Sequence, residues 1–337
     1  MNVAIVILNW NGKEHLKTFL PSVVNHSPDV EIYLADNNST DDSLSFVKTE
    51  FPQIKIIQNQ KNHGFAAGYN EALKQIKTDV YVLLNSDVEV TENWLSPVLD
   101  QLKNDQIAAC QPKIRSYTHK TKFEHAGAAG GFIDKYGYPF CRGRILHINE
   151  TDDQQYDQSS EVFWATGACL FIKAELFHKA GGFDSDFFAH MEEIDLCWRL
   201  KKMGYQIWCE PKSTVYHLGG GTLNYMNPKK TLLNFRNNLF MLHKNYPGKL
   251  FPKILIRMIL DGIAAMKFLM GFQFRHFTAV LNAHIQYYRS IRTLNQKRKH
   301  LKTRSLIQNV SCIYPKSIVF GFYLKGKQTF NKLTPFS

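Results

Sequence analysis

Three short groups of acidic and amide side chains in this sequence could bind a metal ion or transfer a proton. They lie at residues 36–42, 85–87 and 192–195. In the second group, Asp87 follows an apolar run, and a carboxylate in such a place can hold a divalent cation. An isolated Asp after a strand also caps turns and helices, so position alone leaves both interpretations open.

Hydrophobic periodicity predicts the strands and helices that must position these groups. Short apolar runs predict strands at residues 3–8, 31–35, 54–58 and 80–84, with polar, helix-like segments between most of them. This alternation predicts a parallel sheet flanked by helices, in which ligands bind at the carboxyl ends of the strands. Because polar clusters follow the first, second and fourth runs, the sequence predicts a site at that edge.

A phosphate bound at this edge would need a partner other than a glycine-rich loop. The first predicted strand is followed by one glycine, Gly12, instead of G-x-G-x-x-G, and the P-loop pattern is missing from the sequence. Neither glycine-rich cradle is therefore available. A divalent cation held by Asp87 would serve instead.

Seven motifs between residues 6 and 222 resemble, in order, those of the inverting family 2 glycosyltransferases of the GT-A fold, specifically their rhamnosyltransferase-like bacterial branch. The motifs are VILNWNG, ADNNSTDDS, NHGFAAGYN, LLNSDVEV, ATGACLFIK, GGFDSDFFAHMEEIDLCWRL and VYHLGGGT. The resemblance implies an α/β GT-A fold, Rossmann-like with a mostly parallel sheet, and a catalytic domain over residues 1–228. It also implies transfer of a sugar, with inversion, from a UDP- or dTDP-sugar to a hydroxyl of a saccharide or lipid-linked saccharide in cell-surface polysaccharide synthesis. dTDP-rhamnose is the leading candidate donor.

The resemblance also assigns residues to the nucleotide-sugar donor. These are Asn9, Asn11, Asp36, Asn38, Asn62, Gly64, Asn85, Ser86 and Gly167. Asp36 matches the carboxylate that accepts a hydrogen bond from the nucleobase, which suits the N3–H donor of uracil or thymine. Without the family, Asp36 would be read as an Asx-turn residue. Gly64 and Gly68 accompany a predicted helix whose N-terminus is expected to face the nucleotide.

A metal site is implied by two further matches. Asp87 matches the metal ligand of the family's D-x-D motif, and His217 matches the C-terminal histidine that completes the site. The expected cofactor is Mg²⁺ or Mn²⁺, which would neutralise charge on the departing diphosphate. Asn85 replaces the first acid of the motif and is expected to contact nucleotide or ribose. A lone histidine after a strand is otherwise more often structural.

The catalytic base is expected in the third acidic group. Acidic residues there also suit the positive end of a helix dipole. By position, Glu193 matches the family's base aspartate and Glu192 the glutamate before it, and an inverting transfer needs one carboxylate to take the acceptor proton. Asp195 is the alternative base; otherwise it is expected to pair with Arg199 at i+4.

Two glycine-bearing segments are further candidates. Gly167 and Ala168 are small enough to let the backbone approach the sugar, although a tightly packed strand explains them as well. The segment 123–144 has the composition of a sugar-binding loop or of ordinary loop packing. Its candidate contacts are His125, Tyr136, Tyr138, Arg142 and Arg144.

Composition and charge divide the chain. Its 337 residues, 44% of them hydrophobic, can fill a sizeable core, and six scattered cysteines without a signal-like N-terminus favour a cytoplasmic protein with free thiols. Residues 1–228 hold 21 Lys and Arg against 28 Asp and Glu, or −7. Residues 229–337 hold 20 Lys and Arg against one Asp, which is a net charge of +19. Together with the −7 of residues 1–228, this gives the net charge of +12. The second region is expected to have an anionic partner.

Residues 229–337 are predicted to be mainly helical. In the stretch 249–271, charges at Lys253, Arg257 and Asp261 share one face, and apolar residues such as Ile254 and Met258 are expected opposite, as in an amphipathic helix. Charges interrupt this stretch, so a transmembrane helix is not predicted. Packing on the catalytic domain is one interpretation. The favoured one is docking on an anionic membrane at the inner face of the cell membrane, near a lipid-linked acceptor.

Two rival functions remain open on the sequence. A basic helical region beside an α/β domain is compatible with nucleic-acid binding, but the acidic groups would repel nucleic acid, so no such partner is expected. A catalytically inactive carbohydrate-binding relative is the second rival, and Asn85 and Glu193 are its only indications.

Overall fold

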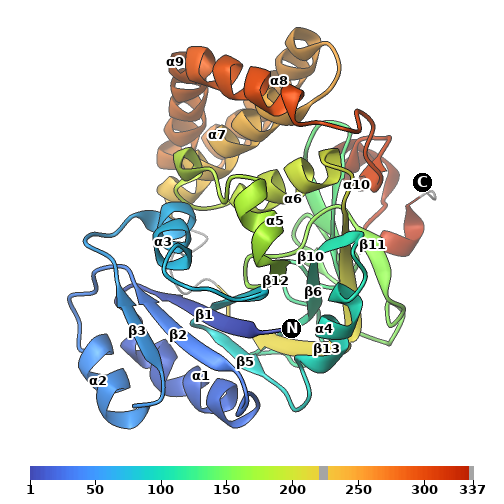
Figure 1. The fold of residues 1–337 in the computed structure, drawn as a ribbon. Coiled ribbons are helices and arrows are strands. Elements are labelled where there is room, and N and C mark those ends of the chain that lie inside the picture. The colour runs from blue at the N-terminus through green and yellow to red at the C-terminus, as the bar shows by residue number, and fades with distance from the viewer. Residues whose placement is uncertain (220–226, 334–337) are drawn as a thin grey trace.

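A nine-stranded sheet forms the centre of the computed structural model, which describes residues 1–219 and 227–333. Its strand order is β11-β13-β6-β12-β4-β1-β2-β3, and β5 pairs with β13. Helices cover both faces of this sheet, and further helices from the C-terminal part of the chain lie at one end (Figure 1). The predicted α/β architecture with a C-terminal helical region is confirmed.

The parallel half of the sheet contains the four predicted strands, β1 (Val3–Asn9), β2 (Glu31–Asp36), β3 (Lys55–Gln58) and β4 (Val80–Asn85). The helices α1 (Lys13–Asn25), α2 (Ser43–Glu50) and α3 (Gly64–Leu73) connect them. Asn9 is in register with Asp36, and Leu8 with Asn85. The polar clusters after these strands therefore meet at one edge, as predicted.

The other half of the sheet adds antiparallel pairs. It comprises β5 (Val88–Val90), β6 (Ile107–Ser116), β11 (Ser160–Val162), β12 (Cys169–Lys173) and β13 (Gln206–His217), with α4 (Ser96–Leu102) packed on it. Because β12 runs antiparallel to β4, with Cys169 opposite Leu84, residues 166–168 lie at the carboxyl end of β4. In the same way, His217 at the end of β13 lies opposite Val88.

A second, five-stranded sheet has the order β10-β9-β8-β7-β14. Its strands are β7 (Gly131–Asp134), β8 (Pro139–Cys141), β9 (Arg144–Ile145), β10 (Ile148–Asn149) and β14 (Ile313–Tyr314). Gly131 is needed for this packing, because a Cβ there would lie 2.1 Å from the Trp164 ring.

Two helices, α5 (Ala174–Lys179) and α6 (Glu192–Lys202), connect β12 to β13, and the 3₁₀ turn Ser185–Phe187 separates them.

The basic C-terminal part forms α7 (Pro228–Asn245), α8 (Leu250–Met270), α9 (Phe274–Thr303) and α10 (Ile318–Lys325), and ends with the 3₁₀ turn Phe330–Lys332. The helix α9 packs against both α7 and α8. In the segments that the structure describes, no helix combines the length and the apolar character needed to cross a bilayer.

One prediction about α8 is wrong. Ile254 does not lie opposite the charges; it shares the buried face of the helix with Arg257 and Asp261. The Arg257 guanidinium and the Asp261 carboxylate pair at 2.8 Å, so the protein satisfies these charges internally. The apolar residues on the other face remain exposed.

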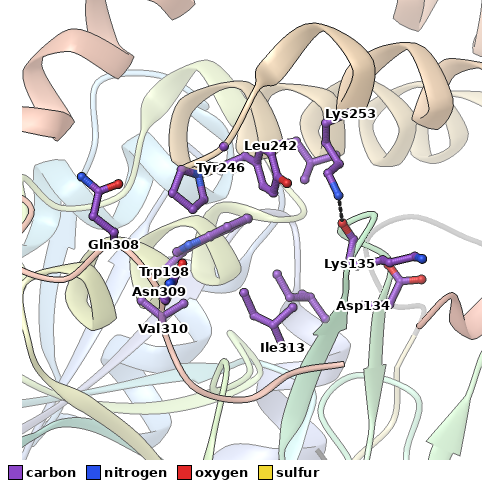
Figure 2. A pocket seen from close by; sticks show the side chains of 13 residues that line it. Asp134, Lys135, Trp198, Leu242, Tyr246, Lys253, Gln308, Asn309, Val310 and Ile313 are labelled. Atoms are coloured by element: carbon purple, nitrogen blue, oxygen red, sulfur yellow. Dashed lines mark hydrogen bonds between the residues drawn. The ribbon is translucent and has the colours of Figure 1, made fainter. Parts of the chain in front are cut away.

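A cavity of 560 Å³ lies where the chain ahead of β14 passes the junction of α7 and α8 (Figure 2). Trp198, Tyr246, Lys253 and Asn309 are among the residues that line it. None of the predicted site residues belongs to this lining, so the candidate site lies elsewhere.

Candidate active site

The carboxyl ends of β1 and β2 form a connected polar cluster. Asp36 is fully buried, and its Oδ1 accepts hydrogen bonds from Asn9 Nδ2 at 3.1 Å and from Ser39 Oγ at 2.5 Å. Its Oδ2 accepts from the Ser39 amide at 2.9 Å, which is the local Asx-turn pattern. The nucleobase contact stays a prediction, and Oδ2, which accepts one hydrogen bond from these partners, keeps a lone pair for a further donor.

Two asparagines shape the loops beside this cluster. Asn11 and Asn38 adopt left-handed backbone conformations, with φ of 51° and 62°. The Asn11 side-chain Oδ1 accepts a hydrogen bond from the Thr40 backbone amide at 2.7 Å, and the Asn11 backbone amide donates to Ser39 Oγ at 2.9 Å. The side chain of Asn11 therefore joins the first loop to the second, whereas Asn38 is exposed.

The first backbone amides of α3 bind protein groups, and that the N-terminus of this helix faces the nucleotide stays a prediction. The Phe188 carbonyl accepts the amides of Phe65, at 2.7 Å, and Ala66, at 3.2 Å, and Asn62 Oδ1 accepts the Gly64 amide at 2.8 Å. A Cβ on Gly64, whose φ is 73°, would lie 2.6 Å from the Phe188 ring. Asn62 and Gly64 thus form a junction with the segment that leads to α6, and their donor contact remains a prediction.

A buried asparagine that sequence reasoning missed completes that junction. The Asn37 side chain donates to the Gly64 carbonyl at 2.9 Å and to Asn62 Oδ1 at 3.1 Å, and accepts from Asn59 Nδ2 at 3.1 Å. It lies directly after Asp36 in the chain, so its position in the motif was visible but its partners were not.

The proposed metal ligands lie next to each other. His217 Nε2 is 3.2 Å from Asp87 Oδ1, and both side chains are buried. Asn85 and Ser86 are partly exposed beside them, and the Asn85 amide donates to the Ala168 carbonyl at 3.0 Å. The last three residues of the VYHLGGGT motif, 220–222, lie outside the described residues.

Glu124 is a third member of this group that the sequence did not reveal. Its Oε2 lies 3.2 Å from His217 Nδ1, on the side of the ring away from Asp87. Burial alone would lower the pKa of His217, but the two carboxylates raise it well above its ordinary value. Burial likewise opposes ionisation of Asp87 and Glu124, and His217 nevertheless lowers the pKa of both carboxyl groups.

The Asp87–His217 pair fits a divalent cation. A carboxylate oxygen and an imidazole nitrogen, 3.2 Å apart, can bind one ion of the size of Mn²⁺ or Mg²⁺ in place of the proton that they share here. Over residues 1–219 and 227–333, no three His, Cys, Asp or Glu side chains are arranged to hold a metal ion by themselves. A cation here would therefore need ligands from a bound molecule as well.

Glu193 lies in the first turn of α6, close to residues 166–168 at the carboxyl end of β4. A Cβ built on Gly167 would lie 3.9 Å from the Cβ of Glu193, and Gly167 precedes the Ala168 carbonyl that binds Asn85. Burial raises the pKa of Glu193 to about 7, against the opposing effect of nearby backbone N–H groups. Its Oε2 is buried without a hydrogen-bond partner in the described structure.

The backbone ahead of Glu193 is strained. His190 and Met191 have φ values of 70° and 73°, which non-glycine residues seldom adopt. Asn237 on α7 holds this loop, because its Nδ2 donates to the carbonyls of Ala189, at 2.9 Å, and His190, at 2.8 Å. The first C-terminal helix thus positions the segment that presents Glu193.

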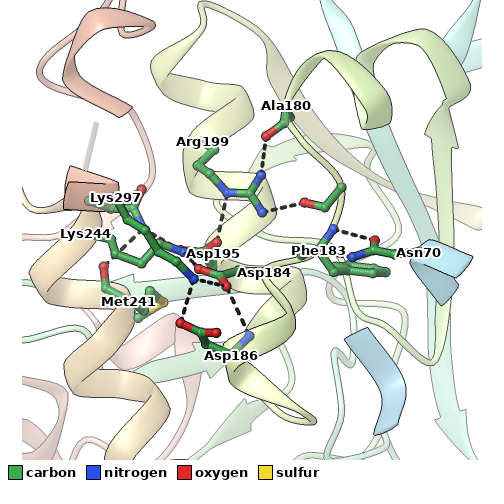
Figure 3. Close-up of polar contacts among 12 residues, drawn as sticks. Asn70, Ala180, Phe183, Asp184, Asp186, Asp195, Arg199, Met241, Lys244 and Lys297 are labelled. Carbon is green, nitrogen blue, oxygen red and sulfur yellow. Dashed lines mark hydrogen bonds and ion pairs between the residues drawn. The ribbon is translucent and has the colours of Figure 1, made fainter. Parts of the chain in front are cut away.

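Glu192 and Asp195, the other two acids of α6, have different surroundings. Glu192 is buried, and burial followed by the charge of Glu193 raises its pKa well above the ordinary value. Asp195 is fully buried and binds Arg199 Nε at 2.8 Å, Lys244 Nζ at 2.9 Å and Asn245 Nδ2 at 2.7 Å (Figure 3). The predicted pairing of Asp195 with Arg199 is confirmed. These partners give Asp195 a structural role, and its place as the alternative base stays an untested prediction.

The family description of glycosyl transferase family 2 matches residues 4–179, which include the ends of β1, β2 and β4 described above. The chain belongs to this family. Among its relatives, the N-acetylglucosaminyl-diphospho-decaprenol L-rhamnosyltransferase of Mycobacterium tuberculosis is 25% identical over 231 residues, which are 63% of this chain and 75% of that protein. The O-antigen biosynthesis protein RfbC of Myxococcus xanthus is 25% identical over 64% of this chain, but the match spans only 17% of RfbC.

Solved structures confirm the GT-A fold of this family 2 member. GalNAc-T7 with UDP, GalNAc and Mn²⁺ matches with a TM-score of 0.56 at 18% identity, over 72% of this chain and 48% of that one. The mannosyltransferase PcManGT of Pyrobaculum calidifontis, in complex with GDP-Man and Mn²⁺, matches with a TM-score of 0.53 at 14% identity, over 90% of this chain and 85% of that one. Both of those structures contain Mn²⁺.

In this family 2 member, the aromatic and basic side chains of residues 123–144 serve mainly to hold the fold together. The Tyr138 ring lies 3.8 Å below the Arg257 guanidinium, and Lys253 lies over the Tyr136 ring at 5.1 Å, so both tyrosines contact α8. That they touch the donor stays a prediction. Arg142 donates to the Ala129 carbonyl at 2.7 Å.

The remaining two candidates of that segment lie together. Arg144 Nη1 is 3.4 Å from His125 Nε2, and both side chains are largely buried; His125 directly follows Glu124 in the chain. Burial lowers the pKa of His125 to about 3, so this histidine is neutral at physiological pH. A donor contact of either residue remains a prediction.

Proposed function

We propose that this family 2 glycosyltransferase is metal-dependent and inverting, and that it transfers a sugar from a UDP- or dTDP-sugar to a hydroxyl of a saccharide or lipid-linked saccharide. One observation supports it above the others. Glu193, a carboxyl group with a pKa of about 7 and an unpartnered oxygen, lies at the same sheet edge as the Asp87–His217 pair. A base and an anion-binding centre are the two groups that such a transfer requires.

In this proposal Glu193 takes the proton of the acceptor hydroxyl as its oxygen attacks the anomeric carbon. The bond from that carbon to the diphosphate oxygen breaks on the opposite face, and the nucleoside diphosphate leaves with the electron pair. Asp87 and His217 would hold Mg²⁺ or Mn²⁺, which neutralises charge on the leaving diphosphate. Asp36 would accept the nucleobase N3–H, and Asn9, Asn85 and Ser86 would contact the rest of the donor.

The sugar is proposed from the relatives. One relative is named a rhamnosyltransferase and another an O-antigen biosynthesis protein, which supports dTDP-rhamnose as the first donor to test and polysaccharide synthesis as the pathway. The first of these names also describes a diphospho-decaprenol acceptor, which supports a lipid-linked saccharide. Such an acceptor would place the enzyme at the inner face of the cell membrane, peripheral to it. The division of the chain at residue 228 likewise stays a proposal.

The test is a thermal-shift and donor-hydrolysis screen of UDP-, dTDP- and GDP-sugars with and without Mn²⁺. We expect one donor to raise Tm only with the cation, and Asp87→Ala to abolish this shift in a protein that still folds. Asp29→Ala is the matched control, because Asp29 is exposed at the opposite end of β2. A variant Asp87→Ala that still hydrolyses donor at the wild-type rate would refute the metal assignment.

A further inference from the structure

The outward face of α8 is apolar although its inward face is charged. Six side chains, here called the α8 stripe, are between 48% and 78% exposed. They are Phe251, Leu255, Ile259, Ile263, Met266 and Met270. Their spacing of three and four residues places them along one side of the helix. The side chains that face the protein include Arg257 and Asp261.

Specific polar contacts fix this orientation. Arg257 pairs with Asp261 and donates to the Tyr136 carbonyl at 3.2 Å, and Lys253 Nζ donates to the Lys135 carbonyl at 2.8 Å (Figure 2). Rotating α8 to bury its apolar side would break the hydrogen bonds from Arg257 and Lys253 to the carbonyls of Tyr136 and Lys135. The exposed stripe is therefore a fixed feature of the surface.

Neighbouring helices extend the apolar surface on both sides. On α9, Tyr288 is exposed and its hydroxyl reaches Met258 Sδ at 3.5 Å, beside the α8 stripe. On α10, the exposed Tyr323 ring lies 5.4 Å from Lys267 Nζ at the other border. Exposed apolar patches of this kind mark sites of protein or membrane association.

Charge decides between these two partners. The only acidic residue of 229–337 is Asp261, which is fully buried, so Lys267, Arg275 and the other exposed charges of this region are positive. A second copy docked on the same face would bring like charges together. A bilayer with anionic headgroups complements both the basic side chains and the apolar stripe.

The same surface adjoins the catalytic side. In the first turn of α9, His276 Nδ1 lies 2.8 Å from Thr231 Oγ1 at the start of α7. The neighbouring Lys229 lies 4.7 Å from the Phe188 ring, in the segment that leads to Glu193. A lipid surface bound there would place the base close to acceptors that stand in it.

We propose that the α8 stripe inserts into the headgroup region of an anionic lipid bilayer, with the basic side chains around it binding the lipid phosphates. As an account of how a lipid-linked acceptor reaches Glu193, this inference rests on the proposed function; the binding itself does not require it. The geometry orients the enzyme with the first turn of α7 toward the membrane.

The experiment is flotation of the full chain with vesicles of phosphatidylcholine containing about 30% phosphatidylglycerol, without donor or metal. The combined variant Leu255→Ser, Ile259→Ser, Ile263→Ser should lower the partition coefficient at least about tenfold, since it removes three large apolar side chains from the stripe. The control Leu306→Ser, at a side chain that is 82% exposed outside the surface, should change it less than about twofold.

Three results would overturn the proposal: a wild-type protein that stays unbound, a triple variant that binds as wild type does, or equal binding to pure phosphatidylcholine. A concentration-dependent dimer in light scattering that the triple variant abolishes would instead assign the face to a second copy. Donor hydrolysis in solution is measured in parallel. Loss of vesicle binding with normal hydrolysis concerns the surface alone, and vesicle binding without hydrolysis of any donor refutes the proposed function alone.

Discussion

Glu193 and Asp195 lie two residues apart on α6, and their surroundings shift their pKa values in opposite directions. Burial raises the pKa of Glu193 to about 7, and no Lys or Arg of the described residues forms an ion pair with it. Burial also acts on Asp195, but Lys244 and Arg199 lower its pKa below the ordinary value. The difference shows how one helix holds a carboxyl group of raised pKa on one side and anchors the C-terminal helices on the other.

The anchoring side is a network of charges that spans three helices. Lys244 on α7 binds both Asp195, at 2.9 Å, and Asp184, at 2.5 Å, and Lys297 on α9 binds Asp184 at 2.5 Å (Figure 3). Burial disfavours the ionised form of Asp184, but the two lysines lower its pKa well below the ordinary value. Residues 229–337 are thus attached to the rest of the protein through acids of the DSDFF and EEID segments.

The largest effect is expected from Glu193→Gln. We predict a kcat lower by about 10²–10⁴-fold, because the amide cannot accept the acceptor proton, with donor affinity nearly unchanged. Steady-state kinetics and donor titration measure both quantities. Glu175→Gln, at an exposed position in the first turn of α5, is the control and should keep full activity. Unchanged turnover in Glu193→Gln would pass the role of the base to Glu192 or another group.

Substitutions on the anchoring side of α6 should lower the free energy of unfolding. Lys244→Met leaves Asp195 and Asp184 each short of a cation, and removal of one partner from a buried ion pair costs about 3–5 kcal/mol. Urea unfolding measures this loss. Lys297→Met is the matched comparison: its side chain is 30% exposed and Asp184 retains Lys244, so a smaller loss is expected. Equal losses in the two variants would contradict the assignment of Lys244 as the central anchor.

The sequence predicted the sheet and much of the site because these depend on local patterns. Apolar runs defined β1 to β4, and the register of a parallel sheet then brought Asp36 and Asn85 to one edge. The i+4 spacing of Asp195 and Arg199 gave their ion pair directly.

Contacts between distant segments could not be predicted in this way. Glu124 reaches His217 from 93 positions away in the chain, and Phe188 covers the N-terminus of α3, 124 positions from Gly64. The orientation of α8 was predicted wrongly for the same reason: periodicity identifies two faces of a helix, but only the tertiary partners, Tyr136 and Tyr138, determine which one is buried.

A change of pH should have the smallest effect, and it separates the carboxyl groups of Glu193 and Asp195 most clearly. A base with a pKa of about 7 is half ionised at pH 7 and about one-tenth ionised at pH 6, so kcat should fall about fivefold between these values. The Asp195 ion pair stays intact in this range, because a lowered pKa gives stability that is lost only at still more acidic pH. Activity at saturating donor and acceptor, measured from pH 5.5 to 8, tests the first expectation.

The stability of wild type relative to matched variants tests the second expectation, that the Asp195 ion pair stays intact in this pH range. A raised carboxyl pKa means that the folded state binds the proton more tightly, so wild type should gain stability relative to Glu193→Gln as pH falls from 8 to 5. Relative to Asp195→Asn, wild type should instead keep a constant advantage, because Asp195 is ionised throughout this range in both the folded and the unfolded chain. If both differences varied with pH in the same way, the two sides of α6 would not be electrostatically distinct, and the assignment of Glu193 as a base tuned by burial would fail.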